Sequence, residues 1–392
     1  MEREPSEVES ARVGLGVIGA GSFGLYALQN FVQVKGVELV AMAGTHRTAA
    51  IAAAKRLGLA DVGEPEDLLG DSDVDLVYIA TPPFLHFEQS MAALTAGKHV
   101  ICEKPLALTV EQADQLVATA RERDLLMITN LMQRYNPVYP KIRHLIDDQV
   151  LGQFLHGQFE NYAADENLPA DHWFWDRSKS GGIFVEHGVH FFDLFAGWLG
   201  PGTVTSAIAG TRARTGVEEQ VECVVRYADD AWVNYYHGFH QAQRMDRQVM
   251  KLIFEHGDVT LLDWIPTRVR IHALVDEQQN RHLAELFPTA ALDISAMYSP
   301  VDRVFHSRHQ SVDAFQMVDL ADGDQDQKQL RYGRMLRAMM ADQVAWIRDR
   351  EHHRRITEIN GRDSVAVACE ADRLARAEEE GGAASEAASG AW

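Results

Sequence analysis

Short apolar runs alternate with helical patterns over the first third of the chain. The runs predict buried strands at residues 12–18, 37–43, 74–80, 100–101 and 125–129. Between them, apolar positions with helical spacing predict helices at residues 23–34, 48–57, 84–96 and 110–123. Near-continuous apolar strands that alternate with helices are typical of a parallel sheet covered on both faces.

The pattern changes after about residue 130. Apolar and polar residues alternate at 219–227, 232–239 and 248–254, which indicates antiparallel strands with one solvated face. Further helices are expected near residues 327–350 and 364–379. We therefore expect an α/β Rossmann domain followed by an α+β domain with a largely antiparallel open sheet. The expected segments are a disordered arm at 1–10, the Rossmann domain at 11–130, the second domain at 131–379 and a disordered, low-complexity tail at 380–392.

Composition and charge narrow the function classes. The 392 residues are 46% hydrophobic, and 37 basic against 57 acidic side chains give a net charge of −20. Such a chain repels phosphate backbones and acidic membrane surfaces, so neither nucleic acid nor membrane is an expected partner. No apolar run reaches the roughly 18 residues of a membrane span, and the acidic first ten residues lack a signal-peptide core. Three scattered cysteines indicate a reducing cytoplasm.

A glycine motif stands where the first strand ends and the first helix begins. Residues 19–24 read GAGSFG, a G-x-G-x-x-G pattern. The first glycine permits the tight turn, the second lets the backbone approach a pyrophosphate, and the third lets helix and strand pack closely. This context predicts a dinucleotide site, with a tight turn that binds no ligand as the alternative.

The acidic residue expected about 20 positions later, for the ribose 2′-hydroxyl, is missing. Gly44 stands there, followed by Thr45, His46 and Arg47. Without a carboxylate, a 2′-phosphate is no longer repelled, and Thr45 and Arg47 could hold it. The cofactor is therefore NAD or NADP, with a slight preference for NADP. Arg47 could equally be a solvated side chain at a helix start.

Two segments carry candidate catalytic groups. Lys104, in Cys102-Glu103-Lys104-Pro105, follows a strand at the sheet edge where α/β enzymes bind ligands. Glu186, His190 and Asp193 have the spacing of one helical face within an apolar segment. The alternatives are an ordinary surface lysine and a hydrogen-bonded core histidine.

Five motifs in order resemble the glucose–fructose oxidoreductase / inositol dehydrogenase / MocA (Gfo/Idh/MocA) family. They are VGLGVIGAGSFG (13–24), IATPPFLH (79–86), AGKHVICEKPLALT (96–109), RYNP (134–137) and GGIFVEHGVHFFDLFAGWLG (181–200). The resemblance implies that Lys104 contacts the substrate hydroxyl and the nicotinamide side, and that His190 is the acid/base. Glu186 stands where the family usually has Asp, and His187 is an additional imidazole. His86 and the Thr81-Pro82 turn match positions near the cofactor.

These arguments give a candidate site. Catalytic roles are predicted for Lys104, His190, Glu186 and His187. The predicted cofactor-binding residues are Gly19, Gly21, Ser22, Phe23, Gly24, Thr45, His46, Arg47, Ala80, Thr81, Pro82, His86, Glu103, Lys104 and Gln133. The predicted substrate-binding residues are Lys104, Tyr162, Trp175, Glu186, His190 and Arg244. The aromatic rings suit a polyhydroxylated ring or pack under a loop, and Arg244 could hold an anionic group or be surface charge. No metal site is expected.

The expected function is an NAD(P)-dependent sugar or polyol dehydrogenase that transfers hydride to or from a secondary hydroxyl. The first alternative, also implied by the resemblance, is a redox-neutral NAD-dependent glycosidase. Such an enzyme oxidises the sugar, eliminates the aglycone, adds water and reduces the sugar again. A cofactor-sensing regulatory protein is the second alternative. We also expect a small carbohydrate or sugar derivative as the substrate, and a homo-oligomer, dimer or tetramer, formed through the open sheet.

Overall fold

The computed structural model describes most of the chain, as two compact units. The described residues are 12–19, 21–44, 51–52, 54–55, 58, 63–164, 168–169, 171–212, 216–306, 311–323 and 328–389. The first unit comprises Met1–Tyr135, Pro169–Asp193 and Gly333–Asp372. The second comprises Asn136–Leu168, Leu194–Tyr332 and Arg373–Trp392.

A five-stranded parallel sheet forms the centre of the first unit, in the order β2-β1-β3-β4-β5. Its strands are β1 (Val13–Ile18), β2 (Val37–Ala43), β3 (Leu76–Ile79), β4 (His99–Cys102) and β5 (Met127–Thr129). Every residue of β1, β3 and β5 is buried, as expected for strands covered on both faces. The predicted parallel sheet is confirmed, and each predicted strand lies within two residues of an observed one.

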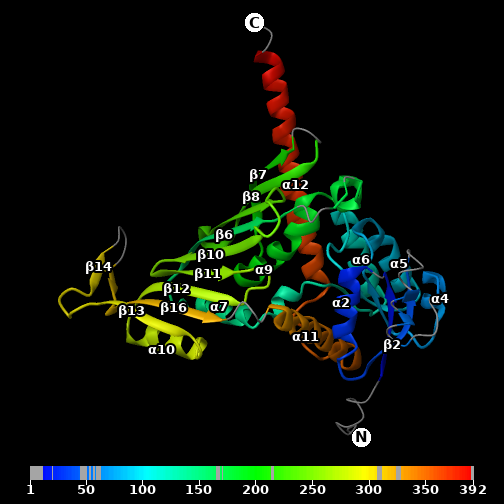
Figure 1. Cartoon of the computed structure of the whole chain (residues 1–392), viewed down its shortest axis with the longest axis horizontal. Helices are drawn as coiled ribbons and strands as arrows, with labels where there is room; N and C mark the ends of the chain where they lie inside the picture. The colour runs from blue at the N-terminus through cyan, green and yellow to red at the C-terminus, as the bar shows by residue number, and fades with distance from the viewer. Residues whose placement is uncertain are drawn as a thin grey trace. The chain divides into compact units, whose positions relative to one another are not determined.

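The first unit also contains helices, drawn from blue to cyan in Figure 1 for α2 to α6 and in green for residues 173–188. They are α2 (Ser22–Phe31), α4 (Pro65–Gly70), η1 (Pro83–Leu85), α5 (His86–Thr95), α6 (Val110–Glu122), η2 (Met132–Tyr135), η3 (Trp173–Trp175), α8 (Arg177–Ser180) and the π-helix η4 (Phe184–Gly188). The sequence analysis missed α4, although Pro65 in its first turn and its Glu64–Asp67 capping box are start signals. Most of the helix predicted at 48–57 lies outside the described residues.

The second unit is built on a nine-stranded sheet, in the order β13-β16-β12-β11-β10-β6-β9-β8-β7. The strands are β6 (Phe154–Tyr162), β7 (Thr203–Thr211), β8 (Glu218–Arg226), β9 (Trp232–Gly238), β10 (Arg247–Phe254), β11 (Gly257–Leu262), β12 (Arg268–Val275), β13 (Ala291–Met297) and β16 (Gln316–Gly323). A separate hairpin pairs β14 (Val304–His306) with β15 (Ser311–Asp313). Figure 1 shows the sheet as a series of neighbouring strands from β7 to β13.

Pairing in this sheet is antiparallel except between β6 and β9, so the predicted, largely antiparallel sheet is confirmed. Burial alternates along β9, where Val233 and Tyr235 are buried and Trp232 is exposed. The sheet therefore has one core face and one open face. Its helices are α7 (Val138–Asp147), η5 (Ala228–Asp230) and α10 (Glu277–Leu286).

The structure departs from the predicted boundaries in two ways. Pro169–Asp193 and Gly333–Asp372 belong to the first unit, where the sequence predicted a single boundary near residue 130. The helices α9 (Val189–Leu199), α11 (Lys328–Arg348) and α12 (Glu358–Ser389) contain residues of both units. In addition, α12 continues as helix to Ser389, in place of the disordered tail expected from residue 380. Alanine and glutamate, which dominate that stretch, are strong helix formers.

Replacing Gly24 by alanine should destabilise the first unit. A Cβ atom at Gly24 would lie 2.6 Å from the Cβ atom of Ala80, so α2 must shift from β3. Overpacking of this kind costs about 1–3 kcal/mol, more than the helix propensity gained. The measurement is the free energy of unfolding in urea.

The matched control is Gly21→Ala, because a Cβ atom at Gly21 meets no atom within 4 Å. It should change the free energy of unfolding by about 0.5 kcal/mol or less. Equal stability of the two variants would contradict the packing argument.

Candidate active site

The turn between β1 and α2 has the geometry of a phosphate cradle. Gly19 has a φ of +112°, and a Cβ atom there would lie 2.5 Å from the carbonyl oxygen of Ala80. The space next to Gly21 is open. The helix then begins at Ser22, followed by Phe23, with no side-chain cap and no acidic residue in its first turn. These residues fit a pyrophosphate, which would meet backbone N–H groups at the helix N-terminus.

The predicted ribose contacts can be followed only in part. Gly44, directly after β2, is described and carries no carboxylate. Thr45, His46 and Arg47 lie outside the described residues. Their part in cofactor choice therefore stays a prediction.

Lys104 and Glu186, which are 82 positions apart in the sequence, form an ion pair. The Lys104 ammonium also donates to the backbone carbonyl oxygen of Glu186 at 2.8 Å. The two side chains are only 20% and 10% exposed. Lys104 follows β4 at the carboxyl edge of the parallel sheet, so its charge is held where α/β folds bind ligands.

A π-helix presents Glu186 to this lysine. The prediction assumed one continuous α-helical face for Glu186, His190 and Asp193, whereas Phe184–Gly188 is π-helical and α9 begins only at Val189. The three side chains have separate tasks, because Glu186 pairs with Lys104 while Asp193 pairs with Arg134. Single π-helical turns occur frequently at functional sites.

His190 is 3% exposed, directly after this turn. Burial, followed by the positive charge of Lys104, lowers the pKa of His190 to about 3. The ring is therefore neutral near pH 7, and a neutral imidazole can accept a proton. The structure thus brings Lys104, Glu186 and His190 together within one unit.

Asp193 is anchored by residues that the sequence analysis did not assign to the site. Its carboxylate accepts two hydrogen bonds from Arg134, at 2.8 Å from Nε and 2.7 Å from Nη2. The side chain of Asn360 donates a third at 3.0 Å. Asp193 therefore ties the start of α9 to Arg134 and to Asn360. Arg134 was visible only as part of the RYNP motif, and nothing in the sequence pointed to Asn360.

Several predicted cofactor residues are buried and bonded within the first unit. The Thr81 hydroxyl donates to the side-chain oxygen of Gln89 at 2.6 Å, and Thr81 is 8% exposed. The ring of His86 is fully buried, and Gln133 is 1% exposed. Ala80 and Pro82 flank Thr81 in the turn after β3.

Glu103 lies in a buried polar network at the ends of β3, β4 and β5. Its carboxylate accepts hydrogen bonds from the Tyr78 hydroxyl and, at 2.8 Å, from the Asn130 amide. Burial raises the pKa of Glu103. Tyr78 and Asn130 were missed by the sequence analysis, because an apolar strand gives no sign that one of its rings carries a functional hydroxyl.

His187 and Trp175 lie in the first unit. His187 is half-buried, and its ring centre is 5.6 Å from that of Phe191. Trp175, in η3, packs edge-on against Phe174 at 4.7 Å. Lys104 bonds Glu186 and not His187, so the catalytic role of His187 stays a prediction.

Tyr162 and Arg244 lie in the second unit. Tyr162 is the last residue of β6, and its ring centre lies 5.0 Å from that of Tyr236. The Arg247 guanidinium stacks on the Tyr162 ring, 4.2 Å from the ring centre. Arg244 is exposed in the turn before β10, with a φ of +69°. Of the two arginines in this segment, Arg247 is thus the one that stacks on the predicted substrate aromatic.

Family models match both halves of the chain. Residues 13–131 match the oxidoreductase family with an NAD-binding Rossmann fold, and residues 139–260 match the GFO/IDH/MocA C-terminal domain. A 1,5-anhydro-D-fructose reductase of Ensifer adhaerens is 32% identical over 231 residues, which are 57% of this chain and 68% of that protein. The chain belongs to the Gfo/Idh/MocA family. It is an oxidoreductase with an NAD-binding Rossmann domain.

Two further relatives show the breadth of this family. A glycosyl hydrolase family 109 protein of Shewanella putrefaciens is 28% identical over 197 residues, 45% of this chain and 42% of that protein. The solved structure of levoglucosan dehydrogenase with NADH and levoglucosan has a TM-score of 0.74 at 17% identity, covering 94% of this chain and 98% of that one. The latter likeness shows the shared fold.

The described ranges contain neither a cluster of metal ligands nor a membrane-spanning helix. No group of three His, Cys, Asp or Glu residues in this part of the chain is placed to hold a metal ion. No helix among the same residues is long and apolar enough to cross a bilayer.

Lys104→Met should raise the pKa of His190. The substitution removes the positive charge that, after burial, lowers this pKa, and it leaves the Glu186 carboxylate nearby. Imidazole resonances followed by NMR against pH should show His190 gaining its proton at a higher pH than in the wild type.

The control is Lys98→Met, at the other end of β4, where the ammonium donates to the carbonyl oxygens of Asp71 and Val74. It should leave the titration of His190 unchanged. An unchanged titration in Lys104→Met as well would contradict the electrostatic coupling.

Proposed function

We propose that this protein is an NAD(P)-dependent dehydrogenase acting on a secondary hydroxyl of a sugar, a polyol or a sugar derivative. The observation that carries the proposal is the Lys104–Glu186 ion pair beside a buried, neutral His190. A fixed cation can stabilise the negative charge that develops on the oxygen during alcohol oxidation, and a neutral imidazole can accept the hydroxyl proton.

The glycine turn supports the cofactor assignment. Gly19, Gly21, Ser22, Phe23 and Gly24 would hold the pyrophosphate at the N-terminus of α2. When bound, the nicotinamide supplies the carbon that accepts or returns a hydride. The absence of a carboxylate at Gly44 favours NADP over NAD, because nothing there repels a 2′-phosphate.

Residues of this chain accept the proton of the substrate hydroxyl and stabilise the negative charge that develops on its oxygen. As the substrate C–H bond gives up its hydride, His190 accepts the hydroxyl proton and a carbonyl group remains. The Lys104 ammonium donates a hydrogen bond to the oxygen while its negative charge develops, which is often the largest single contribution to catalysis. Glu186 orients that ammonium through the ion pair and its backbone carbonyl oxygen. In the reverse direction, His190 returns the proton.

A carbohydrate substrate is supported by the relatives and by the second unit. The similar proteins include a 1,5-anhydro-D-fructose reductase and, in fold, levoglucosan dehydrogenase. In the second unit, the buried amides of Asn161 and Gln248 bond one another at 3.1 Å. Within the described chain, the remaining Asn161 N–H and Gln248 carbonyl oxygen have no hydrogen-bond partner. A hydroxyl both donates and accepts, so it would satisfy this pair.

We also propose a homo-oligomer in a reducing cytoplasm. The open face of the second unit's sheet carries Ile208 and Trp232, which are 51% and 55% exposed. Covering such side chains with a second copy removes apolar surface from water. The cysteines Cys102, Cys223 and Cys369 are free thiols, as in reducing compartments.

The variants Lys104→Ala and His190→Ala should each lower kcat/KM by about 10²–10⁴-fold. Cofactor affinity should change little, because neither side chain forms the glycine cradle. The assay follows formation of reduced cofactor from NADP⁺ and NAD⁺ with a panel of sugars and polyols, and we expect NADP⁺ to be used better.

Lys98→Ala serves as the control, because it removes the same charge at the far end of β4. Its kcat/KM should equal that of the wild type. Full activity of both Lys104→Ala and His190→Ala would overturn the catalytic assignment.

A redox-neutral glycosidase is the second candidate, favoured by the family 109 relative. After oxidation, elimination of an aglycone needs a base for the C–H next to the new carbonyl, and Glu186 and His187 are the candidates. The dehydrogenase proposal predicts that an aryl glycoside without added cofactor releases no phenol. Phenol release without accumulation of reduced cofactor would establish the glycosidase instead.

A further inference from the structure

His86 occupies an unusual position between two loops of the first unit. It is the first residue of α5, and its side chain is fully buried. Its Nδ1 lies 2.6 Å from the carbonyl oxygen of Pro105, and its Nε2 lies 2.8 Å from the carbonyl oxygen of Thr81. Both ring nitrogens thus face backbone carbonyl oxygens, and the ring is enclosed by the protein.

The two carbonyls belong to the segments that leave the parallel sheet. β3 and β4 pair up to Ile79 and Cys102, and the chains then separate. Thr81 lies two residues beyond the β3 end of that ladder. Pro105 lies directly after Lys104. After the last backbone hydrogen bond between the two segments, from the Glu103 N–H to the Ile79 carbonyl oxygen, the imidazole lies between them. A neutral imidazole has one N–H, so it can donate to one of the two buried carbonyl oxygens.

Glu186 fixes the ammonium end of the Lys104 side chain. Its ammonium is held by the carboxylate and the backbone carbonyl oxygen of that residue. Its backbone is followed by the Pro105 carbonyl, which His86 holds. Because both the ammonium group and the backbone next to Lys104 are held, the ammonium occupies one position relative to the sheet edge. A displacement of about 1 Å of a catalytic group can cost 10²-fold in rate.

We propose that His86 is a positioning residue for Lys104, and that it acts by donating the single N–H of its neutral ring, at Nδ1, to the Pro105 carbonyl oxygen. The proposal rests on the proposed function, because it takes Lys104 as the group that meets the substrate oxygen. His86 itself touches neither substrate nor cofactor. Its loss therefore affects the rate of the chemical step more than the binding of either.

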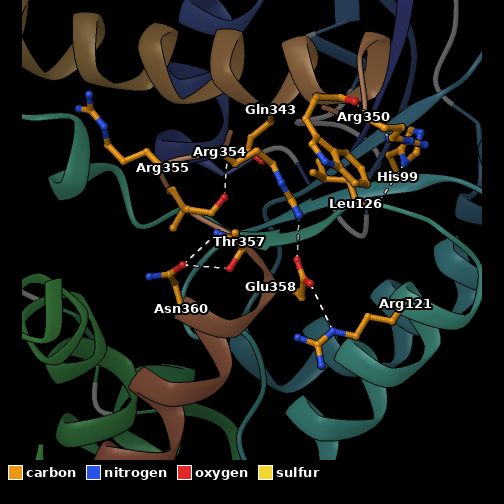
Figure 2. Close-up of polar contacts among 12 residues, drawn as sticks. His99, Arg121, Leu126, Gln343, Arg350, Arg354, Arg355, Thr357, Glu358 and Asn360 are labelled. Atoms are coloured by element: carbon orange, nitrogen blue, oxygen red, sulfur yellow. Dashed lines mark hydrogen bonds and ion pairs between the residues drawn. The ribbon is translucent and has the colours of Figure 1, made fainter. Parts of the chain in front are cut away.

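The test compares His86 with a half-buried histidine of the same unit, His99. His99 begins β4, at the end opposite Lys104, and its Nδ1 accepts a hydrogen bond from the Leu126 backbone N–H at 2.9 Å (Figure 2). Its ring packs edge-on to Trp346 at 6.4 Å. His99 thus matches His86 in residue type and in a side-chain bond to the backbone, but it lies at the end of β4 away from Lys104.

The variants are His86→Leu, His86→Gln, His99→Leu and His99→Gln. For each, kcat, KM, cofactor dissociation constant and melting temperature are measured. His86→Leu should lower kcat by about 10²-fold, with much smaller changes in KM and cofactor affinity. His86→Gln should recover part of kcat, because an amide N–H can still bond one carbonyl. The His99 variants should lower the melting temperature and leave kcat unchanged.

Two outcomes would overturn the proposal. One is an equal loss of kcat in the His86 and His99 variants, which reports general destabilisation. The other is a loss confined to cofactor affinity, which would mean that His86 serves cofactor binding. If His86→Leu does not fold, the comparison of His86→Gln with His99→Gln decides.

Lys104→Ala, assayed alongside, separates this inference from the proposed function. If Lys104→Ala is fully active, the proposed function itself fails. If Lys104→Ala is inactive while the His86 variants behave like the His99 variants, only the positioning role fails.

Discussion

The Lys104–Glu186 ion pair is the constraint on which the candidate site depends. Both side chains are largely withdrawn from water, and a buried charge without a partner is strongly destabilising. The pair also joins the end of β4 to a π-helical turn that lies 82 residues further along the chain. Since the two segments must meet for either charge to be tolerated, the pairing fixes the segment Pro169–Asp193 within the Rossmann unit.

Around this pair, the first unit uses a second layer of polar contacts to hold the groups that react. Arg134 and Asn360 fix Asp193 and hence the first turn of α9, which carries His190. Asn360 belongs to a segment that is itself tied to α6, because the Glu358 carboxylate bonds both Arg354 and Arg121, at 3.0 and 3.3 Å (Figure 2). Residues without any chemistry of their own thus determine where the imidazole stands.

Family membership and geometry answer different questions about this protein. Membership establishes the Rossmann fold, the oxidoreductase class and the kind of cofactor. The site geometry supports proton and hydride transfer at an alcohol, which dehydrogenases and redox-neutral glycosidases share. What distinguishes these two activities is a base for a neighbouring C–H bond. Glu186 and His187 are the residues of this chain that bear on that difference.

The sequence by itself determined the local features of this protein. Periodicity predicted the five strands of the parallel sheet and three strands of the second sheet, β8, β9 and β10, and the glycine motif located the turn before α2. It also pointed to Lys104, Glu186 and His190, through motif resemblance. Only the tertiary structure decided that the turn at Phe184–Gly188 is π-helical, that Asp193 is bound by Arg134 and Asn360, and that the ring of His86 is enclosed between two carbonyls. These features depend on contacts between residues far apart in the sequence, and local patterns carry no information about which distant side chain will meet a given charge.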